Sequence, residues 1–523
     1  MATADAAPAA RNLEIELKLR ATPQVLERLR RSHLVRERAE ARVRTRNLAT
    51  TYFDTPDLRL SKRGIALRVR KDGRRFEQTV KNGEVGGGVA QRIEWNNAVT
   101  ANTPDLAAIA DPEARAAVGL VLPGELQPVF TSRIRRRSCV VNGTDASGTP
   151  CRVELAFDDG LLATETGEAP LAEVELELLD GAPAALYDLA LAMCAVAPLQ
   201  VETRSKAARG FALAADGTPE PYKAAAVALE PAMTVEDALA AIVRACLAQA
   251  LANQPAAVDG RDPEGVHQLR VGLRRLRSAF TLFKKMIPPA QYGWLRGESR
   301  WLAGELGDAR DWDVFLTELL APLEADGASP GLARLRAEAE SQRAAGYVQA
   351  RAALDDVRAT SFVLRLGAWL EGRRWREDGD PDRIALRTAP VQVLADALLA
   401  KRQRAALKAG RHFAELSAEE RHLVRIALKK LRYAVEFFES LYDGDKIKRF
   451  RKRLTRLQND LGALNDLAVA RARLTGLAPV RKDPEVALAA GEVLGWHGRA
   501  AQQDSEGVLE DWQDFADVKP FWQ

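Results

Sequence analysis

The sequence has few cysteines and no long hydrophobic run. Only four cysteines occur in 523 residues, and none forms a CxxC pair, which favours buried thiols in a reducing compartment over disulfides or a zinc site. No stretch approaches the roughly 20 apolar residues of a membrane-spanning helix. The start, MATADAAPAARN, lacks a basic region and an apolar core, so residues 1–10 are expected to be a disordered tail and not a secretory signal. The expected location is the cytoplasm, without a membrane partner.

A strong charge imbalance and the common nucleotide or nucleophile motifs are also missing. The net charge is only +4 and aromatic residues make up 6%, so only local clusters of charge could argue for nucleic-acid binding. The sequence contains no G-x-x-x-x-G-K-[ST] motif, which excludes a P-loop triphosphatase. Of the five histidines only His33 lies before residue 213, and no Ser/His/Asp motif is visible, so a covalent nucleophile is not indicated.

The character of the chain changes near residue 212. Before this point, turn signals separate alternating segments that predict strands at 12–20, 64–71, 75–81, 90–97, 129–141, 151–158 and 171–179, with helices near 22–31 and 183–196. Residues 213–232 have the Pro and Gly content of a linker. From 233 to 515 the periodicity is helical. The sequence predicts a multidomain α+β protein, with an antiparallel β domain at 11–212 and an all-α domain at 233–515.

The second half contains an internal repeat. HQLRVGLRRLR (267–277) aligns with HLVRIALKKLR (422–432) at a shift of 155 residues (422 − 267), and LAGELGDARDWDV (302–314) aligns with LQNDLGALNDLAV (457–469) at the same shift. Two separate blocks at one ungapped shift predict two similar helical bundles related by a pseudo-two-fold axis.

Several predicted strands carry like charges on one face. In RNLEIELKLR (11–20), the apolar residues Leu13, Ile15, Leu17 and Leu19 alternate with Glu14, Glu16, Lys18 and Arg20. Similar faces in the other strands contain Arg68, Arg70, Arg92, Glu94, Arg133, Arg135, Arg137, Glu154, Asp158, Glu173, Glu175 and Glu177.

Each of these faces alone fits a solvent-exposed sheet surface, but together they favour an enclosed site. Like charges two residues apart on a strand are separated by about 6.6 Å, where their repulsion is about 0.6 kcal/mol in water and about 2.5 kcal/mol at an effective dielectric constant of 20. Inside a barrel, the acids need a cation and the bases need an anion. Carboxylates suit Mg²⁺ or Mn²⁺, and guanidinium groups bind phosphate oxygens in pairs.

The order of these motifs resembles the CYTH superfamily, the triphosphate tunnel metalloenzymes. EIELKL matches E-x-E-x-K, and it is followed by YFDT (52–55), LRVR (67–70), Lys81, QRIEW (91–95), FTSRIRR (130–136), ELELLDG (175–181) and SKAARGF (205–211). The resemblance covers about 10–212. It implies an eight-stranded antiparallel β tunnel, or barrel, that binds triphosphate with a divalent metal.

The resemblance also implies roles for individual residues. Catalytic residues are implied at Glu14, Glu16 and Lys18. Ligands for Mg²⁺ or Mn²⁺ are implied at Glu14, Glu16, Asp158, Glu173, Glu175 and Glu177. Phosphate-binding residues are implied at Lys18, Arg68, Arg70, Lys81, Arg92, Arg133, Arg135 and Lys206, with Arg20, Arg44 and Arg137 as further candidates. The implied reaction is metal-assisted hydrolysis of inorganic triphosphate to pyrophosphate and phosphate.

Each repeated helix of the second half has an apolar stripe beside a basic stripe. The apolar stripes, which predict core, are Leu269, Leu273, Leu276, Phe280 and Phe283, and Val424, Leu428, Leu431, Val435 and Phe438. The basic stripes are His267, Arg270, Arg274 and Arg277, and His422, Arg425, Lys429 and Arg432. Because both copies carry it, the basic stripe favours an anion groove over a solvated face. Histidine protonation near pH 6 is expected to add charge.

The helical half resembles the CHAD domain over roughly 230–515, in the two blocks HQLRVGLRRLR and HLVRIALKKLR and in LGDARDWDV. That domain is a helical repeat of two bundles associated with polyphosphate. The resemblance implies long-chain polyphosphate as a partner and polyphosphate granules as a place of association. Nucleic acid is the less favoured ligand, because few aromatic residues accompany the bases.

Three functions stay open from the sequence. The first is an inorganic triphosphatase, as in the bacterial CYTH–CHAD proteins that the domain order resembles. The second is a polyphosphate-binding adaptor with little turnover. The third is a tunnel enzyme that uses ATP, with cyclisation to cAMP, or thiamine triphosphate. The sequence shows no evident base-stacking pocket near the tunnel strands, which favours the first.

Overall fold

The computed structural model describes residues 13–86, 88–119, 121–215, 217–327, 329–503 and 505–522. The predicted tail at 1–10 lies outside these residues. The chain divides into two compact units, which we call the tunnel unit (1–219 and 355–374) and the helical unit (220–354 and 375–523). Among the described residues, no helix has the length and apolar character needed to cross a lipid bilayer.

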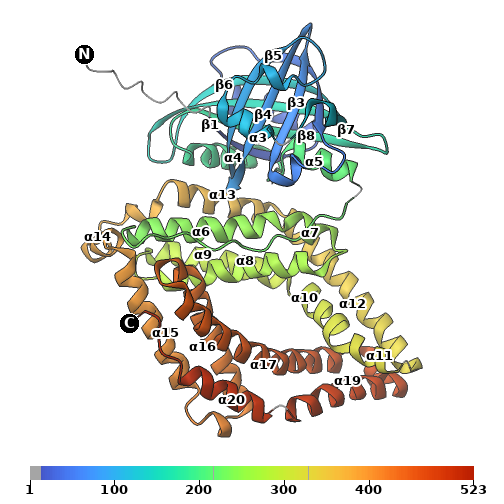
Figure 1. The fold of residues 1–523 in the computed structure, drawn as a ribbon, viewed down its shortest axis with the longest axis vertical. Coiled ribbons are helices and arrows are strands. Elements are labelled where there is room, and N and C mark those ends of the chain that lie inside the picture. Colours follow the sequence, from blue (N-terminus) through green and yellow to red (C-terminus); the bar gives the residue numbers. More distant parts are fainter. Residues whose placement is uncertain are drawn as a thin grey trace. The chain divides into compact units, whose positions relative to one another are not determined.

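The tunnel unit is built on a closed antiparallel barrel (Figure 1). The strands are β1 (Leu13–Arg20), β2 (Arg44–Asp54), β3 (Ile65–Asp72), β4 (Arg75–Gly86), β5 (Val89–Val99), β6 (Gln127–Thr144), β7 (Pro150–Ala163), β8 (Glu168–Asp180) and the short β9 (Gln200–Val201). They pair in the order β5-β4-β3-β2-β6-β7-β8-β1-β9, and a second pairing of β1 with β5 closes the barrel. The predicted eight-stranded antiparallel barrel is confirmed.

The apolar faces of several strands lie on the outside of the barrel, under helices. Leu17 and Leu19 of β1 and Leu176 of β8 are fully buried in one cluster with residues of α1 (Pro23–Arg30) and α4 (Ala184–Val196). Because successive side chains of a strand point to opposite faces, the charged residues between these leucines point into the barrel. The remaining helices of this unit are α2 (His33–Arg36), α3 (Pro112–Val118), α5 (Lys206–Ala214) and α13 (Val357–Glu371).

Strand β2 was missing from the strands predicted by alternation. The physical reason is that its second half is buried on both faces. Tyr52 packs in a cluster with Phe130, whereas the next residue, Phe53, packs in a different cluster with Leu67 and Val80. A strand that buries both faces does not alternate between apolar and polar residues, so periodicity alone does not identify it.

Helix α13 joins the tunnel unit although it lies far along the chain. Its residues Leu364 and Ala368 are buried in the same cluster as Tyr187 of α4, and Gly367 lets the two helices approach closely, since a Cβ there would lie 2.1 Å from the Tyr187 ring. The sequence analysis placed these residues inside the helical domain at 233–515, and in the structure residues 355–374 pack with the tunnel unit.

The helical unit consists of helices that follow the 155-residue repeat. They are α6 (Val235–Ala252), α7 (Gln254–Asp259), α8 (Pro263–Leu282), α9 (Pro289–Glu305), α10 (Gly307–Val314), α11 (Ala321–Asp326), α12 (Pro330–Asp355), α14 (Pro381–Thr388), α15 (Val391–Ala409), α16 (Ala418–Phe438), α17 (Gly444–Gly476), α18 (Ala478–Lys482), α19 (Pro484–Gln503) and α20 (Ser505–Ala516). Both predicted apolar stripes, on α8 and α16, are buried. The copies differ where α9 and α10 meet, because α17 continues through the equivalent position as one helix.

Candidate functional site

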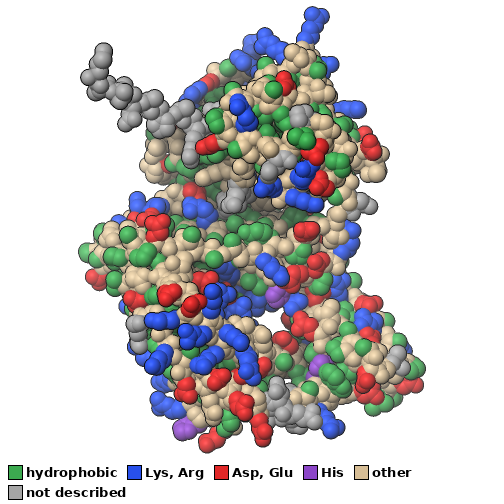
Figure 2. Space-filling model, in the orientation of Figure 1, with side chains coloured by type: hydrophobic (Ala, Val, Ile, Leu, Met, Phe, Trp, Pro, Cys, Tyr) green, Lys and Arg blue, Asp and Glu red, His purple; other side chains and the backbone are tan. Residues whose placement is uncertain are grey.

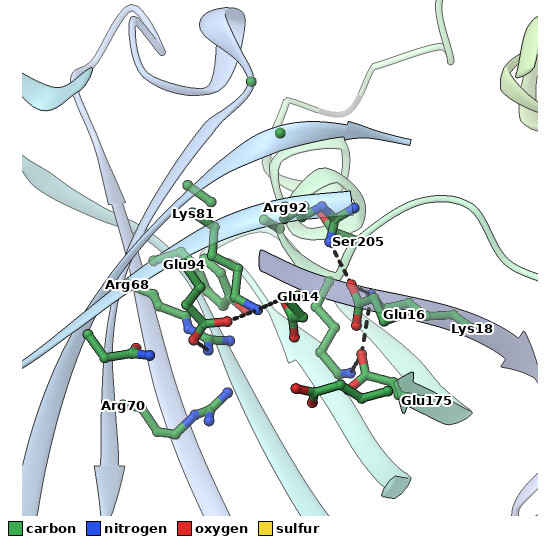
Figure 3. Close-up of a pocket in the computed structure, with 18 of the residues that line it drawn as sticks. Glu14, Glu16, Lys18, Arg68, Arg70, Lys81, Arg92, Glu94, Glu175 and Ser205 are labelled. Carbon is green, nitrogen blue, oxygen red and sulfur yellow. Dashed lines mark hydrogen bonds and ion pairs between the residues drawn. The ribbon is translucent and has the colours of Figure 1, made fainter. Parts of the chain in front are cut away.

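The barrel encloses a polar cavity of about 400 Å³. Charged side chains from six strands and from the start of α5 line it (Figure 3). They are Glu14, Glu16, Lys18, Arg68, Arg70, Lys81, Arg92, Glu94, Arg136, Glu175, Glu177 and Lys206. The predicted charged faces of β1, β3, β5 and β8 therefore point inward in the structure, whereas that of β6 does not.

Ion pairs connect the acids and bases of β1, β4 and β5 along one wall of the cavity. Lys81 Nζ lies 2.7 Å from Glu14 and 2.5 Å from Glu94, and Arg92 donates to Glu16 at 2.9 Å. Lys18 pairs with Glu16 and lies 3.5 Å from Glu175 of β8 (Figure 3). Strand register explains two of these contacts, because Lys81 is opposite Glu94 and Lys18 is opposite Glu175.

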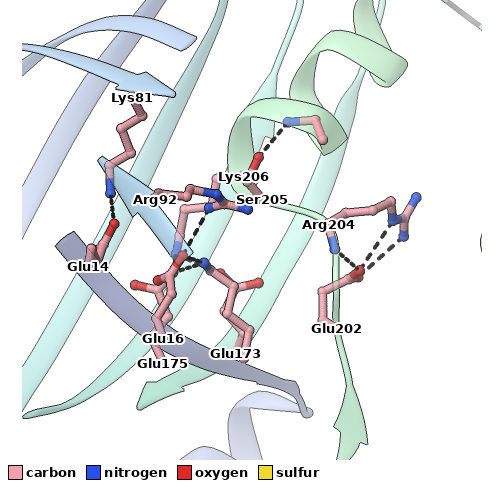
Figure 4. Close-up of polar contacts among 12 residues, drawn as sticks. Glu14, Glu16, Lys81, Arg92, Glu173, Glu175, Glu202, Arg204, Ser205 and Lys206 are labelled. Carbon is pink, nitrogen blue, oxygen red and sulfur yellow. Dashed lines mark hydrogen bonds and ion pairs between the residues drawn. The ribbon is translucent and has the colours of Figure 1, made fainter. Parts of the chain in front are cut away.

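Three carboxylates form a separate cluster, which we call the acidic triad: Asp158, Glu173 and Glu175. Each contributes an oxygen, and these oxygens lie within 4.8 Å of one another. Lys206 Nζ lies 2.7 Å from Asp158. It also lies 2.6 Å from Glu173 and 2.8 Å from Glu175 (Figure 4). Arg136 donates to both oxygens of Asp158, at 2.8 and 2.6 Å, and to Glu175 at 2.5 Å. The triad is therefore neutralised by cations of the protein.

The acidic triad fits a divalent metal ion. Its donors are all carboxylate oxygens, the kind of ligand that Mg²⁺ and Mn²⁺ prefer. Asp158 and Glu173 are fully buried, and Glu173 Oε1 accepts no hydrogen bond of normal geometry in the described structure although it lies beside Lys206. Buried oxygens of this kind are expected to have a cation or donor. Glu14, Glu16 and Glu177, the other predicted ligands, line the cavity, and Lys18 bridges Glu16 to the triad.

Arginines dominate another part of the cavity wall. The neighbouring Arg68, then burial and Arg136, lower the pKa of Arg70 to about 10. The Nε atoms of Arg68 and Arg70 are buried and have no hydrogen-bond partner in the described structure. Although burial opposes it, Asp158 and Glu175 raise the pKa of Arg136, which stays protonated. A phosphate chain bound here would supply the acceptors that these guanidinium groups lack.

One acid in the cavity titrates near neutral pH. Burial, followed by the negative charges of Glu14 and Glu154, raises the pKa of Glu177 to about 7. Glu154 is directly opposite Glu177 in the pairing of β7 with β8. Burial is the main reason why Glu177 holds its proton, and repulsion from the two carboxylates adds to it.

The structure corrects the predicted register of β6. Arg133 and Arg135 lie on the outer surface of the barrel, where Arg135 pairs with the outward-facing Asp159, and the inward residue is Arg136. Inward-facing Arg133 and Arg135 would require the apolar Ile134 between them to face outward. In the structure, part of the barrel interior is itself apolar. Ile134 is buried there with Phe130 and Phe211. The stretch RIRRR has bases at odd and even positions, so alternation did not decide between them.

The other further candidates on the barrel also lie away from the cavity. Arg137 contacts Glu27 of α1, Arg20 donates to Gln200 of β9, and Arg44 is exposed at the start of β2. Glu94 and Arg136 are lining residues for which the sequence analysis assigned no role. The alternation that places Arg92 inward also places Glu94 inward, so Glu94 could have been identified from the same signal.

The helical unit contains a groove of about 680 Å³ between its repeated helices. The bases that line it are His267, Arg270, Arg274, Arg310, Arg425, Lys429 and Arg432, with the acids Asp311, Glu318, Glu436 and Asp466 among them. Figure 2 shows Lys and Arg side chains gathered in the region of α16. Arg425 Nη2 lies 4.0 Å from Asp466, and these residues are the repeat equivalents of Arg270 and Asp311.

Two residues of the predicted basic stripes do not reach this groove. Arg277 is half-buried beside Arg296 and Arg300, and His422 is exposed at the start of α16. The groove therefore uses positions 267–274 of α8 but positions 425–432 of α16, and the two copies contribute segments that differ by about one helical turn. Burial and Arg310 lower the pKa of His267 to about 4, so the expected protonation near pH 6 is wrong for this residue in the ligand-free protein.

Comparisons with known proteins find relatives for both parts of the chain. Residues 12–211 match the model of the CYTH domain, and residues 241–475 match the model of the CHAD domain. A curated inorganic triphosphatase of Haemophilus influenzae is 30% identical over 210 residues, which are 38% of this chain and 54% of that protein. The chain thus spans about half the length of this relative.

Two further relatives extend the comparison. An uncharacterised protein of Mycobacterium tuberculosis is 28% identical over 414 residues, which are 74% of this chain and 75% of that protein. The crystal structure of the CHAD domain from the plant Ricinus communis is 32% identical, with a TM-score of 0.50, and the match covers 57% of this chain and 98% of that domain.

Proposed function

The chain belongs to the proteins in which a CYTH domain is followed by a CHAD domain, and from this premise we propose that its barrel hydrolyses inorganic triphosphate to pyrophosphate and phosphate with Mg²⁺ or Mn²⁺. The observation that carries the proposal is that one polar cavity of the barrel is lined by a set of arginines and by Glu175, which belongs to the adjoining carboxylate triad. Sites for a cation and an anion in one cavity suit a metal-chelated phosphate chain. The relationship to a curated inorganic triphosphatase supports hydrolysis.

In this proposal, different residues bind the metal and the phosphate chain. Asp158, Glu173 and Glu175 would hold the cation, which when bound polarises a phosphoryl oxygen as a Lewis acid. Arg68 and Arg70 bind phosphate oxygens through paired donors. Because guanidinium groups stay protonated throughout, they neutralise the charge that develops as the phosphoryl group is transferred.

Three bases of β1, β4 and β5 are oriented by neighbouring acids. Glu14 orients Lys81, and Glu16 orients Lys18 and Arg92, so that three cations face the cavity. We propose that these cations bind the remaining phosphates of the chain. Direct metal binding by Glu14, Glu16 and Glu177 stays a prediction from the family resemblance.

A phosphate-release assay on the full-length protein tests the proposal. Tripolyphosphate, ATP, thiamine triphosphate, pyrophosphate and long-chain polyphosphate would be compared with Mg²⁺ or Mn²⁺, and products would be analysed for cyclisation. The proposal requires fastest release from tripolyphosphate, with pyrophosphate and phosphate as products. A cyclic product from ATP would indicate a cyclase, and no release from any substrate would favour the binding protein.

Two neighbouring arginines of β6 offer a matched test of which face is functional. We expect Arg136→Ala to lower kcat/KM for tripolyphosphate by about 10²-fold or more, because it removes a charge that faces the reacting phosphate. Arg135→Ala removes the same side chain from the outer surface, where it is about half exposed, and is expected to change activity less than about twofold. Greater loss in Arg135→Ala than in Arg136→Ala would contradict the assigned register.

For the helical unit we propose binding of long-chain polyphosphate in the groove between α8 and α16. The bases His267, Arg270 and Arg274 come from one repeat, and Arg425, Lys429 and Arg432 come from the other. Phe315, which is buried, and Tyr433, which is partly exposed, are the Phe or Tyr side chains in the described groove lining, so stacking on successive nucleic-acid bases has little support. Filter binding with competing DNA separates the two ligands.

A further inference from the structure

The start of helix α5 places a lysine in the middle of the acidic triad. Ser205 caps this helix by accepting a hydrogen bond from the backbone N–H of Ala208 at 3.0 Å, and Lys206 is its first residue. The helix is fixed against the barrel wall, because Phe211 is buried beside Phe130 and because Gly210 lies so close to the Phe130 ring that a Cβ would not fit. The lysine therefore extends from a rigid support.

The ammonium group of Lys206 contacts every member of the triad. Its distances to Asp158, Glu173 and Glu175 are 2.7, 2.6 and 2.8 Å, and its side chain is 9% exposed. Among the described residues it is the one cation that does so. Arg136 contacts Asp158 and Glu175 from the side, and Arg209 contacts only Glu173, at 2.7 Å.

A divalent cation and this ammonium cannot share the triad. Carboxylate oxygens lie about 2.0–2.2 Å from a bound Mg²⁺ or Mn²⁺, so a metal ion held by these three residues needs the space that Lys206 Nζ occupies. Uncompensated buried carboxylates are strongly destabilising. Arg136 and Arg209 supply two positive charges to the three carboxylates, and the Lys206 ammonium supplies the third, although it leaves Glu173 Oε1 without a hydrogen bond of normal geometry.

We infer that the Lys206 ammonium is the internal occupant of the metal site, and that a divalent cation enters the acidic triad only by displacing it. The inference rests on the proposed metal site. Lys206 also lines the cavity, so the displaced ammonium has phosphate oxygens as its nearest new partners when substrate is present. Metal and triphosphate should therefore strengthen each other's binding, because the metal displaces the Lys206 ammonium from the triad and the triphosphate provides oxygens that the displaced ammonium can bind. Lys206 is therefore a positioning residue: its ammonium group occupies the triad and lowers the affinity of the triad for metal.

The test is the affinity of the full-length protein for Mn²⁺ in the absence of substrate, measured by isothermal titration calorimetry and by the spin-resonance signal of free Mn²⁺. Lys206→Met removes the competing charge and is expected to tighten Mn²⁺ binding at least tenfold. Arg204→Met is the matched control, since it removes a nearby cation that pairs with Glu202 and contacts no member of the triad in the described structure, and it is expected to change affinity less than threefold. Equal or weaker binding by Lys206→Met than by wild type would overturn the inference.

Two further comparisons keep the test decisive. If Lys206→Met is poorly folded without metal, Lys206→Gln keeps a polar side chain of similar length, and Mn²⁺ should raise its melting temperature more than that of wild type. A smaller rise would count against the inference. If wild type binds Mn²⁺ and Glu175→Gln does not, while both Lys206 variants bind like wild type, the inference fails and the proposed metal site stands. If none of the proteins binds Mn²⁺, the proposed metal site fails as well.

Discussion

Asp158→Asn is expected to lower the rate of tripolyphosphate hydrolysis by about 10²–10³-fold. Asp158 is fully buried, accepts two hydrogen bonds from Arg136 and lies 2.7 Å from Lys206. The amide has nearly the same shape as the carboxylate but removes the charge that would hold the cation, so metal affinity should fall together with kcat. The measurements are steady-state phosphate release and Mn²⁺ titration of the same preparation.

The adjacent residue of β7 is the control for this substitution. Asp159 points to the outside of the barrel, where it pairs with Arg135, and Asp159→Asn is expected to leave kcat and Mn²⁺ affinity within about twofold of wild type. The two variants carry the same chemical change one residue apart on opposite faces. Similar activity in both variants would mean that the inward face is not the functional one.

The second large effect is expected in the groove of the helical unit. The double variant Arg274→Glu, Lys429→Glu should weaken polyphosphate binding by about 100-fold or more, because it replaces two groove cations, one from each repeat, with charges that repel the ligand. Lys430→Glu is the matched control, since Lys430 neighbours Lys429 but is exposed outside the groove. Filter binding at several salt concentrations measures both, and a reduced salt dependence in the double variant would show that phosphate contacts were lost.

The same groove should bind polyphosphate more weakly as the pH rises through 7. Burial, then Arg425 and Arg274, lower the pKa of Lys429 to about 7 in the ligand-free protein. A bound polyanion favours the protonated lysine, so binding takes up a proton whenever Lys429 starts neutral. The affinity for polyphosphate is therefore highest at a pH below this pKa and falls as the pH rises above it. Affinity that does not change between pH 6 and 8 would contradict proton uptake by Lys429.

The strands with a strong charge alternation were predictable from the sequence, and their inward faces followed from it. Leu17 and Leu19 are buried under helices, and Glu16 and Lys18 between them face the cavity, as alternation requires. The family resemblance added the closed barrel, which alternation alone does not determine. The functional roles of these residues stay predictions.

Other features could not be read from local patterns. Arg136 was missed because bases occupy adjacent positions in β6 and because part of the cavity wall is apolar around Ile134. The attachment of α13 to α4 depends on a contact between Gly367 and Tyr187, which are far apart in the sequence. The groove also omits Arg277 and His422, since the helices α8 and α16 contribute segments one turn apart. Tertiary packing decided each of these cases.

Anomalous diffraction from crystals soaked with Mn²⁺ and tripolyphosphate tests the central claim most directly. That claim is that the barrel binds a phosphate chain and a divalent cation side by side. We predict an anomalous Mn²⁺ peak among Asp158, Glu173 and Glu175, with phosphate density against Arg68, Arg70 and Arg136. A Mn²⁺ peak and phosphate density confined to the outer surface of the barrel, with Lys206 still seated in the triad, would contradict it.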